Sequence, residues 1–163
     1  METLWAPWRM EYILSDKDQA CIFCEQPKAA DWRAVLVLAQ SRSSVVMINR
    51  YPYTNAHLMV APRRHTNDLS ALGAEEYAEL GETLRRTVGL LKDLLHPEGM
   101  NVGLNLGLPA GAGIEDHLHW HVCPRWVGDT NFMPLIGEVR VIPQHLEELY
   151  DRLRPVFAVL DEK

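Results

Sequence analysis

Residues 117–125 have the sequence His117-Leu118-His119-Trp120-His121-Val122-Cys123-Pro124-Arg125, and this stretch decides the fold. Successive side chains of a β-strand point to opposite faces, so a strand here puts the three imidazoles on one face and Leu118, Trp120 and Val122 on the other. An α-helix advances by about 100° per residue and would spread the histidines over roughly 200°. The alternation therefore predicts a strand with one face on a core and the other facing a site of chemistry. The alternative is a strand that carries three incidental polar residues.

The composition limits the class of protein. At 163 residues with 47% hydrophobic side chains, the chain has the length of one domain and can bury a substantial core. It has no apolar run of about 18 residues that could span a membrane, and residues 1–9 do not resemble a secretory signal. A net charge of -6 argues against general affinity for nucleic acid. Three cysteines make no disulfide framework, so we expect a cytoplasmic protein without membrane or nucleic-acid partners.

The rest of the chain combines short apolar runs with two amphipathic segments. The short runs predict strands, beside the histidine strand, at 34–39, 44–49, 57–62, 100–106 and 139–142. Leucines at three- and four-residue intervals predict a long helix at about 73–96, and a similar pattern predicts a helix within 144–160. This order favours an α+β domain with a mostly antiparallel sheet. We divide the chain into an arm at 1–20, a domain core at 21–137 and a C-terminal strand and helix at 138–163.

The histidine face is suited to nucleophilic chemistry on phosphorus. A histidine can attack phosphorus when it is neutral, oriented and beside groups that hold the phosphate oxygens. His119, the middle histidine, is the candidate nucleophile, and His121 can donate a hydrogen bond to phosphate or to a leaving group. The preceding loop at 107–113 contains Gly111 and Gly113, whose backbone N–H groups can approach a phosphate because no side chain intervenes.

These residues resemble the active-site motif of the histidine-triad (HIT) superfamily of nucleotidyl hydrolases and transferases, His-x-His-x-His followed by apolar positions. Residues 49–62 resemble the family's Asn-Arg-x-Pro-x-x-x-Gly-His-x-x-Val-x-Pro segment, and residues 105–107 resemble its Asn-x-Gly. The resemblance covers about residues 20 to 132. It implies a HIT-like α+β fold in a single domain, with a mostly antiparallel five-stranded sheet, one long helix and one C-terminal helix, normally as a homodimer.

Carried over position by position, the resemblance implies roles for particular residues. His119 would attack the α-phosphorus of an adenosine nucleotide and become adenylylated, His121 would contact phosphate and support the leaving group, and His57 would support the histidine network. Asn49 would hold ribose hydroxyls and Asn105 would contact phosphate. Gly111, Gly113 and Trp126 are further nucleotide-binding candidates because of their positions beside the triad. For Trp126, which could stack on a purine, a tryptophan of the core is an equal alternative.

The sequence departs from the family pattern at two places. Many members carry Gln-Ser or Gln-Thr just before the triad, whereas the loop here contains alanines, glycines and an isoleucine before Glu115 and Asp116. Phosphate would then be held mainly by backbone N–H groups and histidines. Ala56 also stands where the family usually has glycine.

The flanking residues resemble the branch of ATP adenylyltransferases and diadenosine tetraphosphate phosphorylases. This implies an enzyme that cleaves diadenosine tetraphosphate with inorganic phosphate, giving ATP and ADP through an adenylyl-histidine. Three alternatives stay open: a hydrolase of dinucleoside polyphosphates or nucleoside phosphoramidates, a nucleotide-binding sensor without turnover, and a metallohydrolase in which the triad binds a catalytic zinc.

Cys21-x-x-Cys24 has the spacing of half a tetrahedral zinc site. His65 and His117 are the candidates for the other two ligands, and several family members hold zinc in a similar way. The site would be structural, and we expect no organic cofactor. Two buried cysteines without a metal are the alternative, whereas a redox dithiol is disfavoured by the intervening Ile22 and Phe23.

Overall fold

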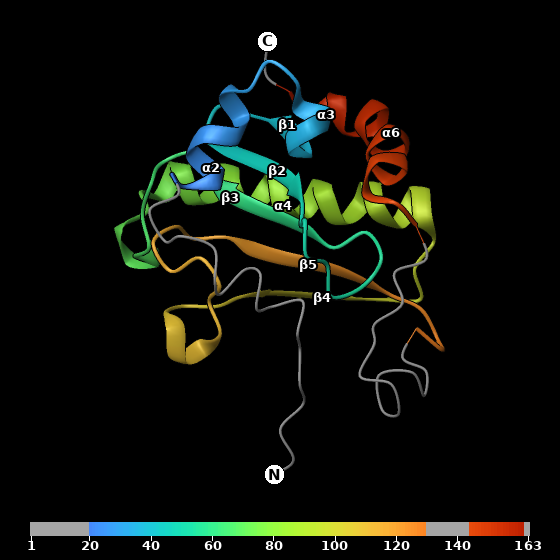
Figure 1. Ribbon diagram of the computed structural model, residues 1–163. Coiled ribbons are helices and arrows are strands. Elements are labelled where there is room, and N and C mark those ends of the chain that lie inside the picture. Colours follow the sequence, from blue (N-terminus) through green and yellow to red (C-terminus); the bar gives the residue numbers. More distant parts are fainter. Residues whose placement is uncertain (1–19, 130–143, 162–163) are drawn as a thin grey trace.

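The computed structural model describes residues 20–129 and 144–161. The predicted N-terminal arm and the predicted strand at 139–142 lie outside these residues. Within them, the structure is one α+β unit built on a single sheet (Figure 1). The predicted fold class is therefore confirmed. None of the described helices has the length and apolar content that a membrane-spanning helix needs.

The sheet contains five strands, which are β1 (Val37–Gln40), β2 (Ser44–Ile48), β3 (Leu58–Pro62), β4 (Gly99–Leu104) and β5 (Trp120–Arg125). Their order across the sheet is β1-β2-β3-β5-β4, and every neighbouring pair is antiparallel. The order places β5 between β3 and β4, and it leaves β4 at one edge. Met59 on β3 lies opposite His121 on β5.

Apolar side chains pack on both sides of the sheet, because alternate residues of its strands point to opposite faces. The larger core lies where α4 (Ala74–Leu95) and α6 (Leu146–Phe157) pack on strand residues such as Val46, Ile48 and Val60. Each fully buried leucine of these helices stabilises the fold by about 1.5–3 kcal/mol. A smaller cluster on the other face surrounds Phe23 and contains Val37, Val45, Met47, Met59 and Ala61.

Short helices complete the connections. Figure 1 shows α2 (Ile22–Glu25) and α4 on opposite sides of the sheet. The others are η1 (Gln26–Lys28), α3 (Trp32–Val35), η2 (Leu69–Ala71), η3 (Leu108–Ala110) and η4 (Ala158–Leu160).

Two predicted strand boundaries were wrong. The run at 34–39 begins as the helical turn α3, because the Asp31 carboxylate caps it by accepting the N–H groups of Arg33 and Ala34. Leu36 then takes a left-handed conformation, with φ of 62°, before β1 starts at Val37. The triad strand also starts late, since β5 begins at residue 120 and the first two triad histidines precede the hydrogen-bonded ladder.

Candidate active site

Two neighbouring strands bring the histidines together. His57 immediately precedes β3, and His121 lies in β5 next to it. The ring centroid of His121 is 5.0 Å from that of His57 and 4.9 Å from that of His119. His57 and His119 are almost fully buried. The three residues that the sequence assigned to catalysis therefore form one continuous cluster.

Backbone and amide donors fix the tautomer of His57. Its Nδ1 faces the backbone N–H of Tyr53 at 3.1 Å and the Nδ2 of Asn49 at 3.3 Å. A backbone N–H can only donate, so Nδ1 is the accepting nitrogen and Nε2 carries the proton. His57 Nε2 therefore donates to His121 Nδ1 across 2.9 Å. The remaining nitrogen of His121, Nε2, must then carry a proton as well.

This leaves His121 with a hydrogen-bond donor to offer. Its Nε2 is buried and has no hydrogen-bond partner within residues 20–129 and 144–161. A buried donor without a partner is costly and often marks a functional site. The geometry thus gives His121 an N–H group ready for an acceptor such as a phosphate oxygen.

His119 has the opposite arrangement. Its Nδ1 donates to the carbonyl oxygen of His117 across 2.8 Å, so the proton is on Nδ1 and the Nε2 lone pair is free to act as a nucleophile. Burial lowers the pKa of His119, and burial followed by the nearby His119 lowers the pKa of His121 to about 4. Both rings are therefore neutral at pH 7. A neutral ring with a bare Nε2 thus lies beside a neutral ring with an N–H donor.

These lowered pKa values predict a loss of stability in acid. An unfolded chain protonates His121 near its ordinary pKa of 6.5, whereas the folded chain resists protonation down to about 4. Between these values the unfolded state binds more protons, so the free energy of unfolding falls as the pH is lowered from 6.5 towards 4. Urea unfolding across this range measures the effect. His121→Gln should make the pH dependence shallower, and an unchanged slope would contradict the assignment.

The glycine-rich loop is tied to the strand before it. Asn105 donates from Nδ2 to the carbonyl oxygen of Gly111 across 3.3 Å. Gly107 and Gly111 have φ values of 79° and 89°, which favour glycine because a Cβ would be strained there. Asn105 thus holds the loop in shape, a contact that the sequence did not predict. Gly113 is exposed on the same loop.

The two remaining nucleotide-binding candidates, Asn49 and Trp126, differ in their contacts. Asn49 is part of the cluster through His57, and its Oδ1 accepts the N–H of Tyr51 at 2.9 Å. Trp126 directly follows β5 and is half-buried, with its backbone N–H bonded to Asp129. Their contacts with a nucleotide are untested and stay predictions.

The four predicted metal ligands do come together. One donor atom from each of Cys21, Cys24, His65 and His117 lies within 4.8 Å of all the others. The Nδ1 of His117 is 3.2 Å from the sulfur of Cys21 and 3.6 Å from that of Cys24. The sulfur of Cys24 is 3.4 Å from the Nδ1 of His65. Ordinary zinc–sulfur and zinc–nitrogen bonds in a tetrahedron put such atoms about 3.6 Å apart, so the set fits zinc.

The surroundings of the cluster also suit a metal. His117 donates from Nε2 to the carbonyl oxygen of Pro62 across 2.7 Å, which leaves its Nδ1 lone pair facing the thiols. Burial and the neighbouring Cys21 thiol raise the pKa of Cys24 to about 11. A zinc ion reverses this preference, because it binds the thiolate and displaces the proton.

Two aromatic residues next to the histidines were missed by the sequence analysis. The ring of Tyr53 lies 4.6 Å from that of His57 and 5.7 Å from that of His121. The ring of Phe23 lies 5.0 Å from that of His119 and 5.1 Å from that of His117. Phe23 stands between the two cysteines and Tyr53 four residues before His57, so their positions beside assigned residues were the available signal.

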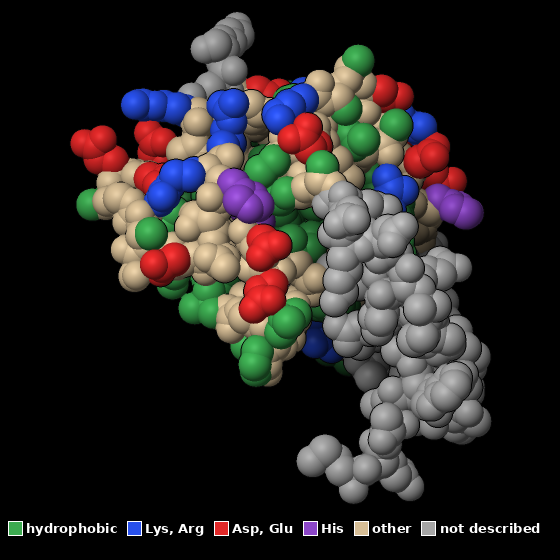
Figure 2. Space-filling view, turned by 60° about the vertical axis from the view of Figure 1, so that its left-hand side comes forward, with side chains coloured by type: hydrophobic (Ala, Val, Ile, Leu, Met, Phe, Trp, Pro, Cys, Tyr) green, Lys and Arg blue, Asp and Glu red, His purple; other side chains and the backbone are tan. Residues whose placement is uncertain are grey.

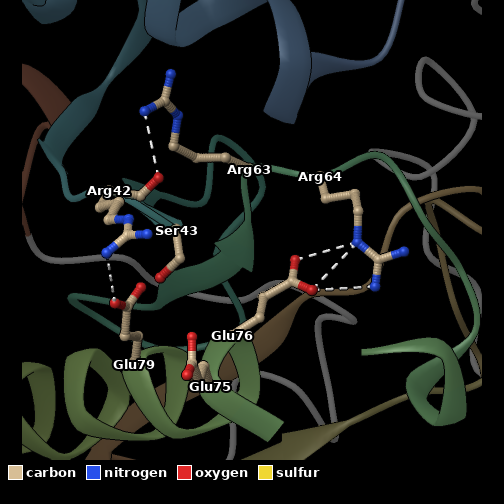
Figure 3. A pocket seen from close by; sticks show the side chains of 7 residues that line it. All are labelled: Arg42, Ser43, Arg63, Arg64, Glu75, Glu76 and Glu79. Carbon is tan, nitrogen blue, oxygen red and sulfur yellow. Dashed lines mark hydrogen bonds and ion pairs between the residues drawn. The ribbon is translucent and has the colours of Figure 1, made fainter. Parts of the chain in front are cut away.

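A separate surface pocket does not contain any of these residues. Its volume is about 290 Å³, and it lies between the β2 and β3 ends and the start of α4 (Figure 3). Its cations and carboxylates largely neutralise one another, as in the ion pairs Arg64–Glu76 at 3.0 Å and Arg42–Glu79 at 3.8 Å. Figure 2 likewise shows side chains of both charges intermingled on the face drawn, with histidine at separate places among them. None of the histidines or thiols of the two clusters described above lines this pocket.

Fold and site together define a class: an α+β protein with a buried histidine cluster beside a Cys₂His₂ site. The family model described as HIT domain matches residues 34–127, and the chain belongs to the HIT family. It is 40% identical over 157 residues to an AP-4-A phosphorylase of Mycobacterium tuberculosis, covering 91% of this chain and 80% of that protein. The predicted family is thereby confirmed.

Two further similar proteins support the assignment to this family. A bis(5'-adenosyl)-triphosphatase of Dictyostelium discoideum is 27% identical over 120 residues, covering 70% of this chain and 80% of that protein. Among solved structures, a Zn-bound histidine triad family protein from Mycobacterium smegmatis is 28% identical, with a TM-score of 0.66, covering 86% of this chain and 95% of that one. The phosphorylase and the triphosphatase are named as enzymes, and the expectation of a HIT-type enzyme is confirmed.

Proposed function

We propose that this protein cleaves diadenosine tetraphosphate with inorganic phosphate, giving ATP and ADP through an adenylyl-histidine intermediate. The observation that carries the proposal is the pairing of a bare Nε2 on His119 with an N–H on His121. Similarity to an AP-4-A phosphorylase at 40% identity supports this substrate class.

The proposed reaction has two steps. In the first, His119 Nε2 forms a bond to the α-phosphorus, and the bond to the bridging oxygen breaks with its electron pair leaving on ATP. The N–H of His121 Nε2 stabilises that departing oxygen by a hydrogen bond and keeps its proton. In the second, an oxygen of the inorganic phosphate dianion attacks the adenylyl phosphorus, the phosphorus–nitrogen bond breaks with its electron pair returning to His119 Nε2, and ADP is released. His57 supports both steps, because its Nε2–H holds His121 in the required tautomer.

Binding of the nucleotide is assigned to the predicted residues. Asn49 would hold the ribose, Trp126 the base, and Asn105 with the N–H groups of Gly111 and Gly113 the phosphates. The absence of Gln-Ser or Gln-Thr side chains before the triad makes backbone donors the main phosphate ligands.

Zinc would be held by Cys21, Cys24, His65 and His117 as a structural ion. When bound, it cross-links the N-terminal turn to the segment that precedes β5. The chemistry does not need it, because His119 and His121 are not among the four donors. This separation favours nucleophilic catalysis over the metallohydrolase alternative.

The second candidate function is hydrolysis, which shares the first step and uses water in the second. Similarity to a bis(5'-adenosyl)-triphosphatase favours it. Incubation of the zinc-loaded protein with diadenosine tetraphosphate, with and without phosphate, separates the two. We expect ADP and ATP in equal amounts only when phosphate is present, and ³²P-phosphate should enter ADP. Formation of ATP plus AMP without phosphate would establish the hydrolase. If no dinucleotide or phosphoramidate gives a product, the alternative of a nucleotide-binding sensor without turnover would be supported.

We also propose that the protein is a homodimer joined through β4. This strand forms a sheet edge, and three apolar side chains on it or soon after it are exposed: Val102 by 45%, Leu106 by 49% and Leu108 by 61%. Open edges bearing apolar residues favour pairing with another strand. Val102→Lys should shift the sedimentation of the protein from dimer to monomer, whereas Val127→Lys, at a residue 86% exposed outside β4, should not. A monomeric wild type would refute the proposal.

A further inference from the structure

The turn that carries the two thiols, Cys21 to Cys24, also carries Phe23, which is almost fully buried at 2% exposure. On one side the Phe23 side chain packs in the smaller core cluster with sheet residues such as Met47 and Met59. On the other side it meets the triad. The position of its ring is therefore set jointly by the sheet and by the turn.

Phe23 contacts a metal ligand and the nucleophile at once. Its ring is stacked on that of His119 with an angle of 29° between the ring planes and 5.0 Å between centroids. It is tilted by 48° against the ring of His117, with 5.1 Å between centroids. The Cys21 sulfur lies 3.2 Å from His117 Nδ1. The rings of His117, Phe23 and His119 are thus packed one against the next.

This contact matters because hydrogen bonding alone does not fix the orientation of the His119 ring. The only hydrogen bond found for its ring in the described residues is the one from Nδ1 to the His117 carbonyl. One hydrogen bond tolerates a range of ring tilts, so the direction of the Nε2 lone pair also depends on the rings packed against His119, which are Phe23 stacked on its face and His121 edge-on. A stacked aromatic ring fixes the plane of the imidazole. Misplacement of a reacting group by about 1 Å can lower a rate by about 10²-fold.

We propose that Phe23 is a positioning residue that couples the Cys₂His₂ site to the nucleophile. Closing the thiol turn around zinc presses the Phe23 ring onto His119 and orients Nε2 for attack. The inference rests on the proposed role of His119 for its kinetic consequence, but the coupling itself concerns only the orientation of the ring. Loss of zinc would therefore loosen His119 without removing any atom of the catalytic cluster.

The test compares Phe23→Leu with the wild type, both loaded with zinc. We expect full zinc content, kcat on diadenosine tetraphosphate about 10- to 100-fold lower and KM changed by less than about threefold. Phe23→Tyr, which keeps the aromatic face, should recover most of kcat. Ile22→Leu, in the same turn but without a ring contact to the triad among the described residues, should leave kcat unchanged. A zinc-loaded Phe23→Leu with wild-type kcat would overturn the proposal.

A second readout needs no turnover. The side-chain ¹⁵N and ¹H resonances of His119 in the wild type should shift when a chelator removes zinc, while in Phe23→Leu they should be nearly insensitive to it. Equal responses in both proteins would refute the coupling even if the enzyme is active. A shift in the wild type alone would support it even if no dinucleotide is cleaved. Where Phe23→Leu does not melt cooperatively, Phe23→Met serves in its place for both readouts.

Discussion

Replacing His119 with alanine is expected to lower turnover of diadenosine tetraphosphate by about 10⁴-fold or more, because removal of a nucleophile leaves only substrate binding and polarisation. Zinc content should stay complete, since the His119 imidazole is not one of the four clustered donors. Melting temperature should fall only as far as the lost packing against Phe23 requires. Initial rates, elemental analysis and thermal melts measure the three quantities.

Trapping of the adenylyl-histidine intermediate tests the role of His119 most directly. Wild-type protein incubated with labelled diadenosine tetraphosphate in the absence of phosphate should retain an adenylyl group that is labile to acid and stable to alkali, as a histidine phosphorus–nitrogen bond is. His119→Ala should retain none. His145→Ala, which removes an exposed histidine at the start of α6, is the matched control and should react normally. Loss of zinc with His119→Ala, and no trapped protein in any variant, would favour the metallohydrolase.

Much of the site could be predicted from the sequence because it depends on local order. The strict alternation of His117, His119 and His121 required them to share one side of an extended segment, and they do so although β5 begins only at residue 120. The spacing of Cys21 and Cys24 required both thiols to lie on one turn. The sequence also named His65 and His117 as the histidines that would join these thiols, and the bond from the Leu118 N–H to the Thr66 carbonyl brings the loop with His65 alongside.

The protonation pattern could not be predicted, since it depends on backbone conformation. Nothing in the residue types says that the N–H of Tyr53 points at His57 Nδ1, or that the carbonyl of His117 faces His119 Nδ1. These two backbone groups leave His121 with an N–H donor, by way of His57, and His119 with a bare Nε2. The predicted start of the first strand, at residue 34, was wrong for a similar reason. The apolar run at 34–39 suits a strand, but the capping side chain of Asp31 stabilises a helical turn in its first half.

Removing the metal site is expected to reduce stability and not only activity. If zinc binds the folded chain at about 1,000 times its dissociation constant, it contributes about 4 kcal/mol to the free energy of unfolding. For a domain of this size such a loss lowers the melting temperature by about 8–16 °C. Cys21→Ser, or dialysis of the wild type against a chelator, should each produce this shift together with loss of zinc.

The ligand histidines should differ in a graded way. His117 is almost fully buried and also bonds to the Pro62 carbonyl, so His117→Ala leaves that carbonyl without its partner and opens a cavity. His65 is exposed, so His65→Ala should cost the metal and little more.

Cys123→Ala is the matched control, because it removes a buried thiol outside the cluster and should keep zinc. A melting curve that a chelator does not move, with no zinc by elemental analysis, would show that the four donors pack without a metal. Comparison with the His119 variant then separates the two expected roles within residues 117–121. His117 substitution should cost fold and metal first, whereas His119 substitution should cost turnover at full zinc occupancy.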